Sequence, residues 1–219
     1  MNFITSYYWQ QGEAAPNATS LLLQQFSCEK RGRSIVFGCV CEESKAAHTS
    51  GIASGYMTER LQVWLYEEAL TQCRNAEARK LPTLGEGVRR TIWQTDGELG
   101  GICTSVCGLL CIDKRLLFFY RGQSELYLLN SRFGRANLTR LSARTEGLAL
   151  QWGEIQKGAG ILLATHDFCQ GVGEQSVREC LAVREIDTRE QADKRLKELG
   201  REAERRKVRN AGAILVLAG

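Results

Sequence analysis

His166 and Asp167 stand side by side at the end of an apolar run of strand length, GILLATHDFCQGV (160–172), in a chain with only two histidines. Strand ends often carry chemistry, because a rigid sheet fixes the backbone there while the following loop lets side chains meet a ligand. Two chemistries are open to His166: it could ligate Zn²⁺ together with Cys41, or activate the thiol of Cys41 or Cys169 as a nucleophile. The sequence offers no obvious third and fourth zinc ligand, so a hydrogen-bonded polar residue is the simpler interpretation.

The nine cysteines are an odd number, they are scattered through apolar segments, and none forms a CxxC pair. Cys39 and Cys41 alternate in one strand-like run, and Cys103, Cys107 and Cys111 share one face of another. We therefore expect reduced thiols that pack as small hydrophobic side chains, not a disulfide framework or a metal cluster.

Composition describes an ordinary globular protein. A length of 219 residues with 43% hydrophobic and 25% charged residues predicts a single domain over 1–219 with a sizeable core. The formal net charge of +4 is too small to predict nucleic-acid binding. No apolar run is long enough for a membrane helix, and the start lacks the basic flank and apolar core of a signal peptide. These features predict a cytoplasmic protein without a membrane contact, and they do not indicate its oligomeric state.

The hydrophobic pattern predicts runs of strands flanked by blocks of helices, which is typical of an α+β sandwich. The predicted strands are 18–28, 34–40, 102–112, 115–122, 124–132, 135–142, 161–168 and 211–218, and the predicted helices are 49–75, 84–100, 176–183 and 190–208. A charged turn at 29–33 joins the first two strands into a hairpin, and turn residues every eight to twelve positions in the middle of the chain indicate an antiparallel sheet.

Four segments, in this order, resemble the metal-dependent PPM protein phosphatases, the type 2C serine/threonine phosphatases. SIVFGCVCEESKAAHTSGIASGYMTERL is similar to their first strand, D-G-x-G-G turn and long helix, and GGICTSVCGLLCIDKRLLFFYRGQSELYLLN to their G-T-T hairpin and VGDSRAYL element. GAGILLATHDFCQGV is similar to LLLCSDGL, and RKVRNAGAILVLAG to the terminal RDNATVVVV strand. The resemblance covers nearly the whole chain and implies a four-layer αββα sandwich with two central antiparallel sheets.

The resemblance also implies where the metal site would be. The family holds two or three Mg²⁺ or Mn²⁺ ions in a cluster of carboxylates, since hard cations prefer oxygen ligands. In this register Cys41 and Glu42 occupy the Asp-Gly turn, Gln123 the Asp of G-D-S, His166 the Asp of S-D-G, and Arg209 the Asp before a matching Asn210. Near the start, Asn17 matches, Thr19 replaces an Asp, and Ala14 or Ala15 replaces a phosphate-binding Arg.

The lost carboxylates predict a catalytically inactive domain, a pseudophosphatase that binds or regulates without a cofactor. A two-metal phosphatase needs its ions to activate water and to clamp the phosphoryl oxygens. The alternative is a divergent phosphatase with residual, Mn²⁺- or Mg²⁺-dependent phosphomonoester hydrolysis. A register shifted by one residue would place Asp167 in the S-D-G position and leave Glu42 or Glu43 in the first turn.

The replacements also change the predicted charge of the cleft. We expect the strands that end at Cys41, His166 and Arg209 to place these side chains around one shallow cleft. Gln123, His166 and Arg209 would make that cleft neutral or basic, which favours an acidic or phosphorylated protein partner. The basic segment 194–209 either contributes to anion binding or is a solvated helix face with glutamates interspersed.

Overall fold

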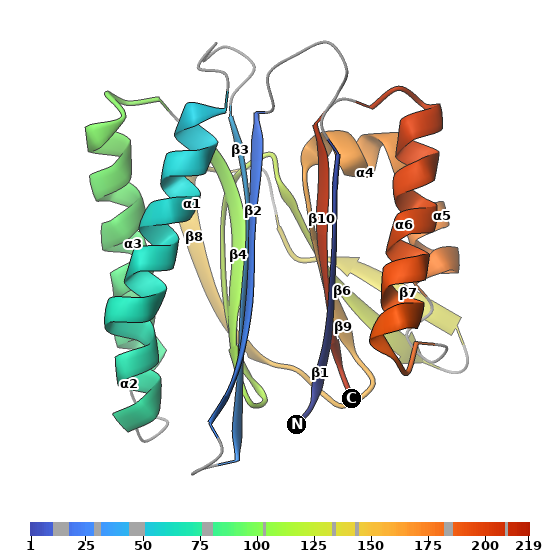
Figure 1. The fold of residues 1–219 in the computed structure, drawn as a ribbon, viewed down its shortest axis with the longest axis horizontal. Helices are drawn as coiled ribbons and strands as arrows, with labels where there is room; N and C mark the ends of the chain where they lie inside the picture. The colour runs from blue at the N-terminus through green and yellow to red at the C-terminus, as the bar shows by residue number, and fades with distance from the viewer. Residues whose placement is uncertain are drawn as a thin grey trace.

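The computed structural model describes residues 1–10, 18–28, 32–43, 51–75, 81–102, 104–132, 135–142, 145–181, 186–208 and 210–219. Two five-stranded antiparallel sheets pack face to face, and helices cover the outer face of each sheet (Figure 1). The predicted α+β fold with two central antiparallel sheets is confirmed.

The first sheet has the order β1-β10-β9-β6-β7 and the second has the order β2-β3-β4-β5-β8. The strands of the first sheet are β1 (Phe3–Gln10), β6 (Glu125–Arg132), β7 (Arg135–Arg140), β9 (Gly160–Ala164) and β10 (Ala211–Ala218). Those of the second are β2 (Thr19–Cys28), β3 (Arg33–Glu43), β4 (Thr104–Ile112), β5 (Arg115–Gly122) and β8 (Thr145–Glu154). The edge strands β1 and β2 lie on the same side of the sandwich (Figure 1).

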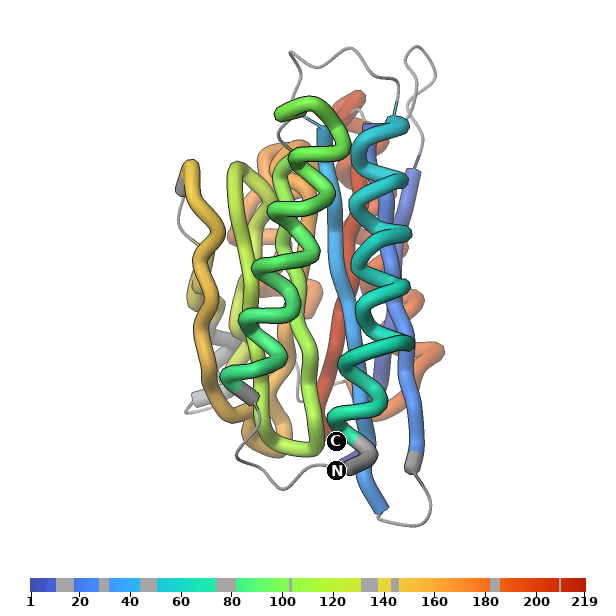
Figure 2. The backbone as a smooth tube through the Cα atoms, turned by 90° about the vertical axis from the view of Figure 1, so that its left-hand side faces the viewer, coloured from blue at the N-terminus to red at the C-terminus, as the bar shows by residue number. Residues whose placement is uncertain are grey.

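The helices divide between the two outer faces. One continuous rod, α1 (Ile52–Trp64), the π-helical turn η2 (Leu65–Ala69) and α2 (Leu70–Asn75), runs beside α3 (Leu81–Glu98) over the second sheet (Figure 2). The first sheet is covered by α4 (His166–Val172), α5 (Glu174–Cys180) and α6 (Arg189–Arg205). None of the described helices is both long and apolar enough to cross a membrane.

The strand sequences explain the layers. β3 is buried at every residue from Ile35 onward, because its two faces pack against different partners. Val36 and Val40 point into the core between the sheets, whereas Phe37 and Cys39 point into the core beneath α1. Consecutive residues of a strand alternate between faces, so this pattern fixes the face of every later β3 residue.

The predicted strands and helices are all present where the structure describes them, but two strands were missed. β1 and β8 were not predicted, and the strand predicted over 161–168 ends at Ala164. Thr165 is the N-cap of α4 and its hydroxyl accepts a hydrogen bond from the Phe168 N–H. His166 is therefore the first residue of a helix, not the last residue of a strand.

Seven cysteine side chains are described, and all seven are free thiols. Six of them are buried, and Cys180 is half-buried. Cys39 and Cys41 lie in one core cluster and Cys107 and Cys111 in another, as their alternation predicts. Cys103 lies outside the described residues.

The two ends of the chain lie together. β1 pairs with β10 so that Phe3 lies opposite Ala218, and the Gly219 N–H donates to the Asn2 carbonyl. Both ends therefore lie at one end of the sandwich, and α4 lies toward the other (Figure 1).

Candidate functional site

Glu42, Glu125 and His166 form a polar cluster between the sheets, near the start of α4. Glu125 is the first residue of β6 and pairs with Ala164 at the end of β9, so this register brings His166 to Glu125. Nδ1 of His166 lies 3.1 Å from Oε1 of Glu125. Since a carboxylate only accepts, the ring N–H donates this bond. Glu42 comes from the opposite sheet, on the face of β3 that also carries Val40.

The Glu42 carboxylate joins the two sheets. Its Oε2 accepts from the His166 backbone N–H at 3.3 Å and from the Ser124 hydroxyl at 3.5 Å. Glu42 is 9% exposed, so these bonds compensate for lost hydration. Glu42 therefore holds the first residue of α4 in place.

The Glu125 carboxylate is surrounded by donors from three elements. Tyr127 donates its hydroxyl to Oε2, and Arg140 of β7 lies 3.5 Å from the Oε1 that also meets His166. Burial, followed by the neighbouring Cys169 and Glu125, raises the pKa of Tyr127 above its usual range, so the phenol remains a neutral donor. The Glu125 side chain is 3% exposed, and these protein groups compensate for the lost hydration of its carboxylate.

Glu125 was not predicted from the sequence, because in the segment GQSEL only Gln123 was matched to the Asp of G-D-S. A signal was present, because a glutamate opens the otherwise apolar strand ELYLLN. Gln123 itself is exposed in the turn between β5 and β6, and its backbone N–H donates to Ser105 at 3.1 Å. The structure thus places Glu125, not Gln123, within the polar cluster.

Glu43 supports the start of α1. Its Oε1 accepts from the backbone N–H groups of Ala53 at 2.7 Å and Ser54 at 3.4 Å. The N-cap residue Gly51 has no side chain to offer these donors, and a carboxylate is favourable at the positive end of a helix. Glu43 is 6% exposed and acts as the missing cap.

Cys41 does not share a cleft with His166, and that part of the prediction is wrong. The Cys41 side chain lies on the opposite face of β3 from Glu42, in the core beneath α1 with Cys39. A hydrogen bond from Cys39, with help from Thr58 and the nearby Arg121, lowers the pKa of Cys41 against the effect of burial. Strand alternation causes the separation, because adjacent residues of a strand point in opposite directions.

Cys169 lies closer to the cluster, on α4. Burial raises the pKa of its thiol, and the negative charge of Glu125 adds to the effect. A thiol must lose its proton to act as a nucleophile, and this environment favours the protonated form. The arrangement therefore does not support an activated Cys169–His166 pair.

The other predicted site residues are placed at the same end of the sandwich or lie outside the description. Thr19 is buried and its hydroxyl donates to the Asn210 carbonyl at 3.2 Å. Asn210 has a φ of 54°, and its buried Oδ1 has no hydrogen-bond partner among the described groups. Asp167 lies half-buried in the first turn of α4. Arg209 is outside the described residues, as are Ala14, Ala15 and Asn17.

The described side chains do not fit a bridged pair of divalent cations. Hard cations need several oxygen ligands with acidic charge to balance them. Here oxygens of Glu42, Glu43 and Glu125 already accept from protein donors, and Arg140 supplies positive charge at Glu125. In the described part of the chain, no group of three or more His, Cys, Asp or Glu residues could hold a metal ion.

Solved structures of bacterial phosphatases share this fold. The Mycobacterium tuberculosis serine/threonine phosphatase PstP/Ppp is 16% identical, with a TM-score of 0.71 over 99% of both chains. A PstP catalytic domain in complex with two manganese ions has the same identity and TM-score, over 98% of this chain and 96% of that one. Stp1 from Staphylococcus aureus is 12% identical, with a TM-score of 0.74 over 100% of this chain and 96% of that one.

No protein-family model matches the sequence, and no curated protein matches it. The structural likeness therefore defines the class of fold: the chain has the fold of the PP2C-type serine/threonine phosphatases.

Proposed function

We propose that this chain is a catalytically inactive PPM-type domain that acts as a binding or regulatory module. One observation carries the proposal: the buried carboxylates at the end of β3 and the start of β6 accept hydrogen bonds from the protein itself. Glu42 holds His166, Glu43 caps α1, and Glu125 meets Tyr127, His166 and Arg140.

The chemistry of the fold supports this reading. A two-metal phosphatase uses its ions to activate water and to clamp the phosphoryl group. A guanidinium and a phenol can balance a buried carboxylate, but neither generates hydroxide from water at neutral pH. Tyr127 and Arg140 thus stabilise the Glu125 carboxylate without supplying a group that activates water.

A divergent metal-dependent phosphatase is the second candidate, and the unpartnered Oδ1 of Asn210 favours it. This amide oxygen is a suitable ligand for a hard cation, and Asp167 would provide a carboxylate from the first turn of α4. Mn²⁺ or Mg²⁺ would be the cofactor in this case.

Calorimetry with MnCl₂ and turnover of p-nitrophenyl phosphate separate the two candidates. We expect no tight Mn²⁺ binding and no hydrolysis by the wild-type chain. Asp167→Ala tests the second candidate, and Asp187→Ala, at an exposed position before α6, is the matched control. Tight Mn²⁺ binding, with turnover abolished by Asp167→Ala and retained by Asp187→Ala, would establish the divergent phosphatase.

The proposed ligand is an acidic or phosphorylated group on a partner protein, contacted by Arg209. A guanidinium is always charged and matches phosphate geometry with two parallel donors. We also propose a cytoplasmic location, since free thiols are typical of reducing compartments.

A further inference from the structure

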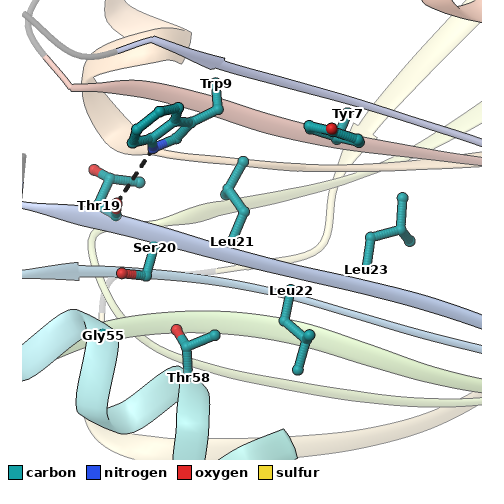
Figure 3. Close-up of a pocket in the computed structure, with 9 residues that line it drawn as sticks. All are labelled: Tyr7, Trp9, Thr19, Ser20, Leu21, Leu22, Leu23, Gly55 and Thr58. Carbon is teal, nitrogen blue, oxygen red and sulfur yellow. Dashed lines mark hydrogen bonds between the residues drawn. The ribbon is translucent and has the colours of Figure 1, made fainter.

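A groove of about 640 Å³ runs between the two edge strands on the open side of the sandwich. One end of the groove is at Thr19, which pairs with Glu42 of β3, and the groove extends from there along β2. Its volume is typical of ligand sites. Figure 3 shows the nine residues that line it: Tyr7 and Trp9 from β1, Thr19, Ser20, Leu21, Leu22 and Leu23 from β2, and Gly55 and Thr58 from α1.

The β2 edge presents unpaired backbone groups to this groove. Glu43 N–H donates to the Ala18 carbonyl, so the backbone of Ala18 points toward β3. Antiparallel pairing alternates this direction at each residue, which turns the N–H and C=O groups of Leu21 and Leu23 away from β3. No described strand pairs with that side of β2.

Neither edge carries the features that usually prevent strand pairing. Natural edge strands are protected by charged side chains, proline or bulges. β1 (FITSYYWQ) and β2 (TSLLLQQFSC) contain no charged residue and no proline. These edges are therefore open to an added strand.

The groove has a wall on each side of the β2 edge. Tyr7 and Trp9 form one wall and are 58% and 47% exposed, although they share a face of β1 with the buried Phe3. α1 forms the other wall, and Gly55 lies on the part of α1 that faces Ser20 of β2 (Figure 3). An extended segment on β2 would direct alternate side chains toward the two walls.

Side-chain hydrogen bonds join β1 and β2 at two points along this edge. Trp9 Nε1 donates to the Thr19 carbonyl at 3.3 Å, and Gln25 Nε2 donates to the Phe3 carbonyl at 3.2 Å. Thr19 and Gln25 lie six positions apart on β2. At roughly 3.3 Å per residue, the intervening edge accommodates an added strand of about six residues.

We propose that this groove binds an extended, uncharged peptide segment of a partner protein by strand addition to β2. Among the described residues, none that lines the groove is charged. A charged side chain in the occupant would therefore lose hydration without gaining an opposite charge. Main-chain bonds to Leu21 and Leu23 would provide affinity, and the two walls would select the side chains. The proposal is independent of whether the carboxylate cluster hydrolyses phosphate.

Gly55→Leu tests the site by filling the α1 wall. A Cβ at Gly55 would meet only the Ser20 hydroxyl, at 3.8 Å, so the variant should fold. Gly97→Leu is the matched control, because Gly97 is also helical and a Cβ there would meet nothing within 4 Å.

The probe is a peptide selected from a phage-displayed library of random octapeptides on the immobilised full chain, then synthesised. We expect selected peptides with an uncharged central segment, at least tenfold weaker binding to Gly55→Leu, and unchanged binding to Gly97→Leu. Amide exchange at Leu21 and Leu23 should slow when the peptide binds. Failure to select a peptide, a charged consensus, or equal binding to both variants would overturn the proposal. Sedimentation tests a different occupant. If the wild-type chain self-associates and Gly55→Leu does not, the occupant of the groove is a second copy of the chain and not a partner's peptide.

Discussion

His166 and Glu125 share a hydrogen bond between Nδ1 and Oε1 although 41 residues separate them in the chain. The pairing of β6 with β9 creates this contact, because it places Glu125 opposite Ala164. The same carboxylate also meets Tyr127 and Arg140, so one buried acceptor joins β6, β7 and α4.

Glu125→Ala should therefore destabilise the fold. Removing one partner of a buried, hydrogen-bonded charge leaves its donors unsatisfied, and we expect the free energy of unfolding to fall by about 3 kcal/mol. Urea denaturation measures the change. Glu154→Ala, at an exposed position on β8, is the control and should change stability by less than about 0.5 kcal/mol. Equal stabilities of the two variants would contradict a structural role for Glu125.

Cys73 on α2 should make stability fall in alkaline solution. Burial raises the pKa of this thiol from 9.0 to about 11, so folding favours its protonated form. The protonated thiol therefore makes its full contribution to stability below pH 9. As the pH rises through 11, the free energy of unfolding falls by about 2 to 3 kcal/mol.

The pH dependence of unfolding in Cys73→Ala tests this effect. Between pH 9 and 11 the variant should lose less stability than the wild-type chain. Leu70→Ala is the control, because it also removes buried apolar atoms from α2 but no titrating group. The prediction is wrong if the free energy of unfolding of Cys73→Ala falls with pH as steeply as that of the wild-type chain and of Leu70→Ala.

Arg209 should govern anion binding by this chain. We expect phosphate, sulfate and a phosphopeptide to raise the melting temperature of the wild-type chain, and Arg209→Asp to abolish the shift. Charge-assisted hydrogen bonds to a phosphate contribute about 1.5 to 3 kcal/mol in a partly desolvated site. Arg205→Asp makes the same charge change at an exposed position on α6 and should retain the shift. Identical responses in all three proteins would exclude an anion site at Arg209.

The sequence predicted the layers because most of the strands carry strong apolar patterns. β1 and β8 were missed for opposite reasons: β1 mixes aromatic and hydroxyl residues, and β8 is largely exposed and mixes polar with apolar residues. Propensity alone is weak for such edge strands, where neighbours decide the conformation.

The polar cluster was only partly predictable. Glu42 and His166 were predicted because four segments resemble the PPM phosphatases in their order along the chain. The position of Glu125 depends on the register of β6 and β9. Cys41 was assigned to the wrong side of β3, since alternation predicts that neighbours diverge but not which neighbour faces the other sheet.

The pairing of β1 with β10 makes the chain nearly circular. Phe3 lies opposite Ala218, so a short glycine-rich linker could join the ends without crossing the sandwich. A reporter fused at either end would emerge from the same end of the molecule, away from α4 (Figure 1). The chain can thus be tethered, immobilised or inserted into another protein through the end of the sandwich that lies away from α4.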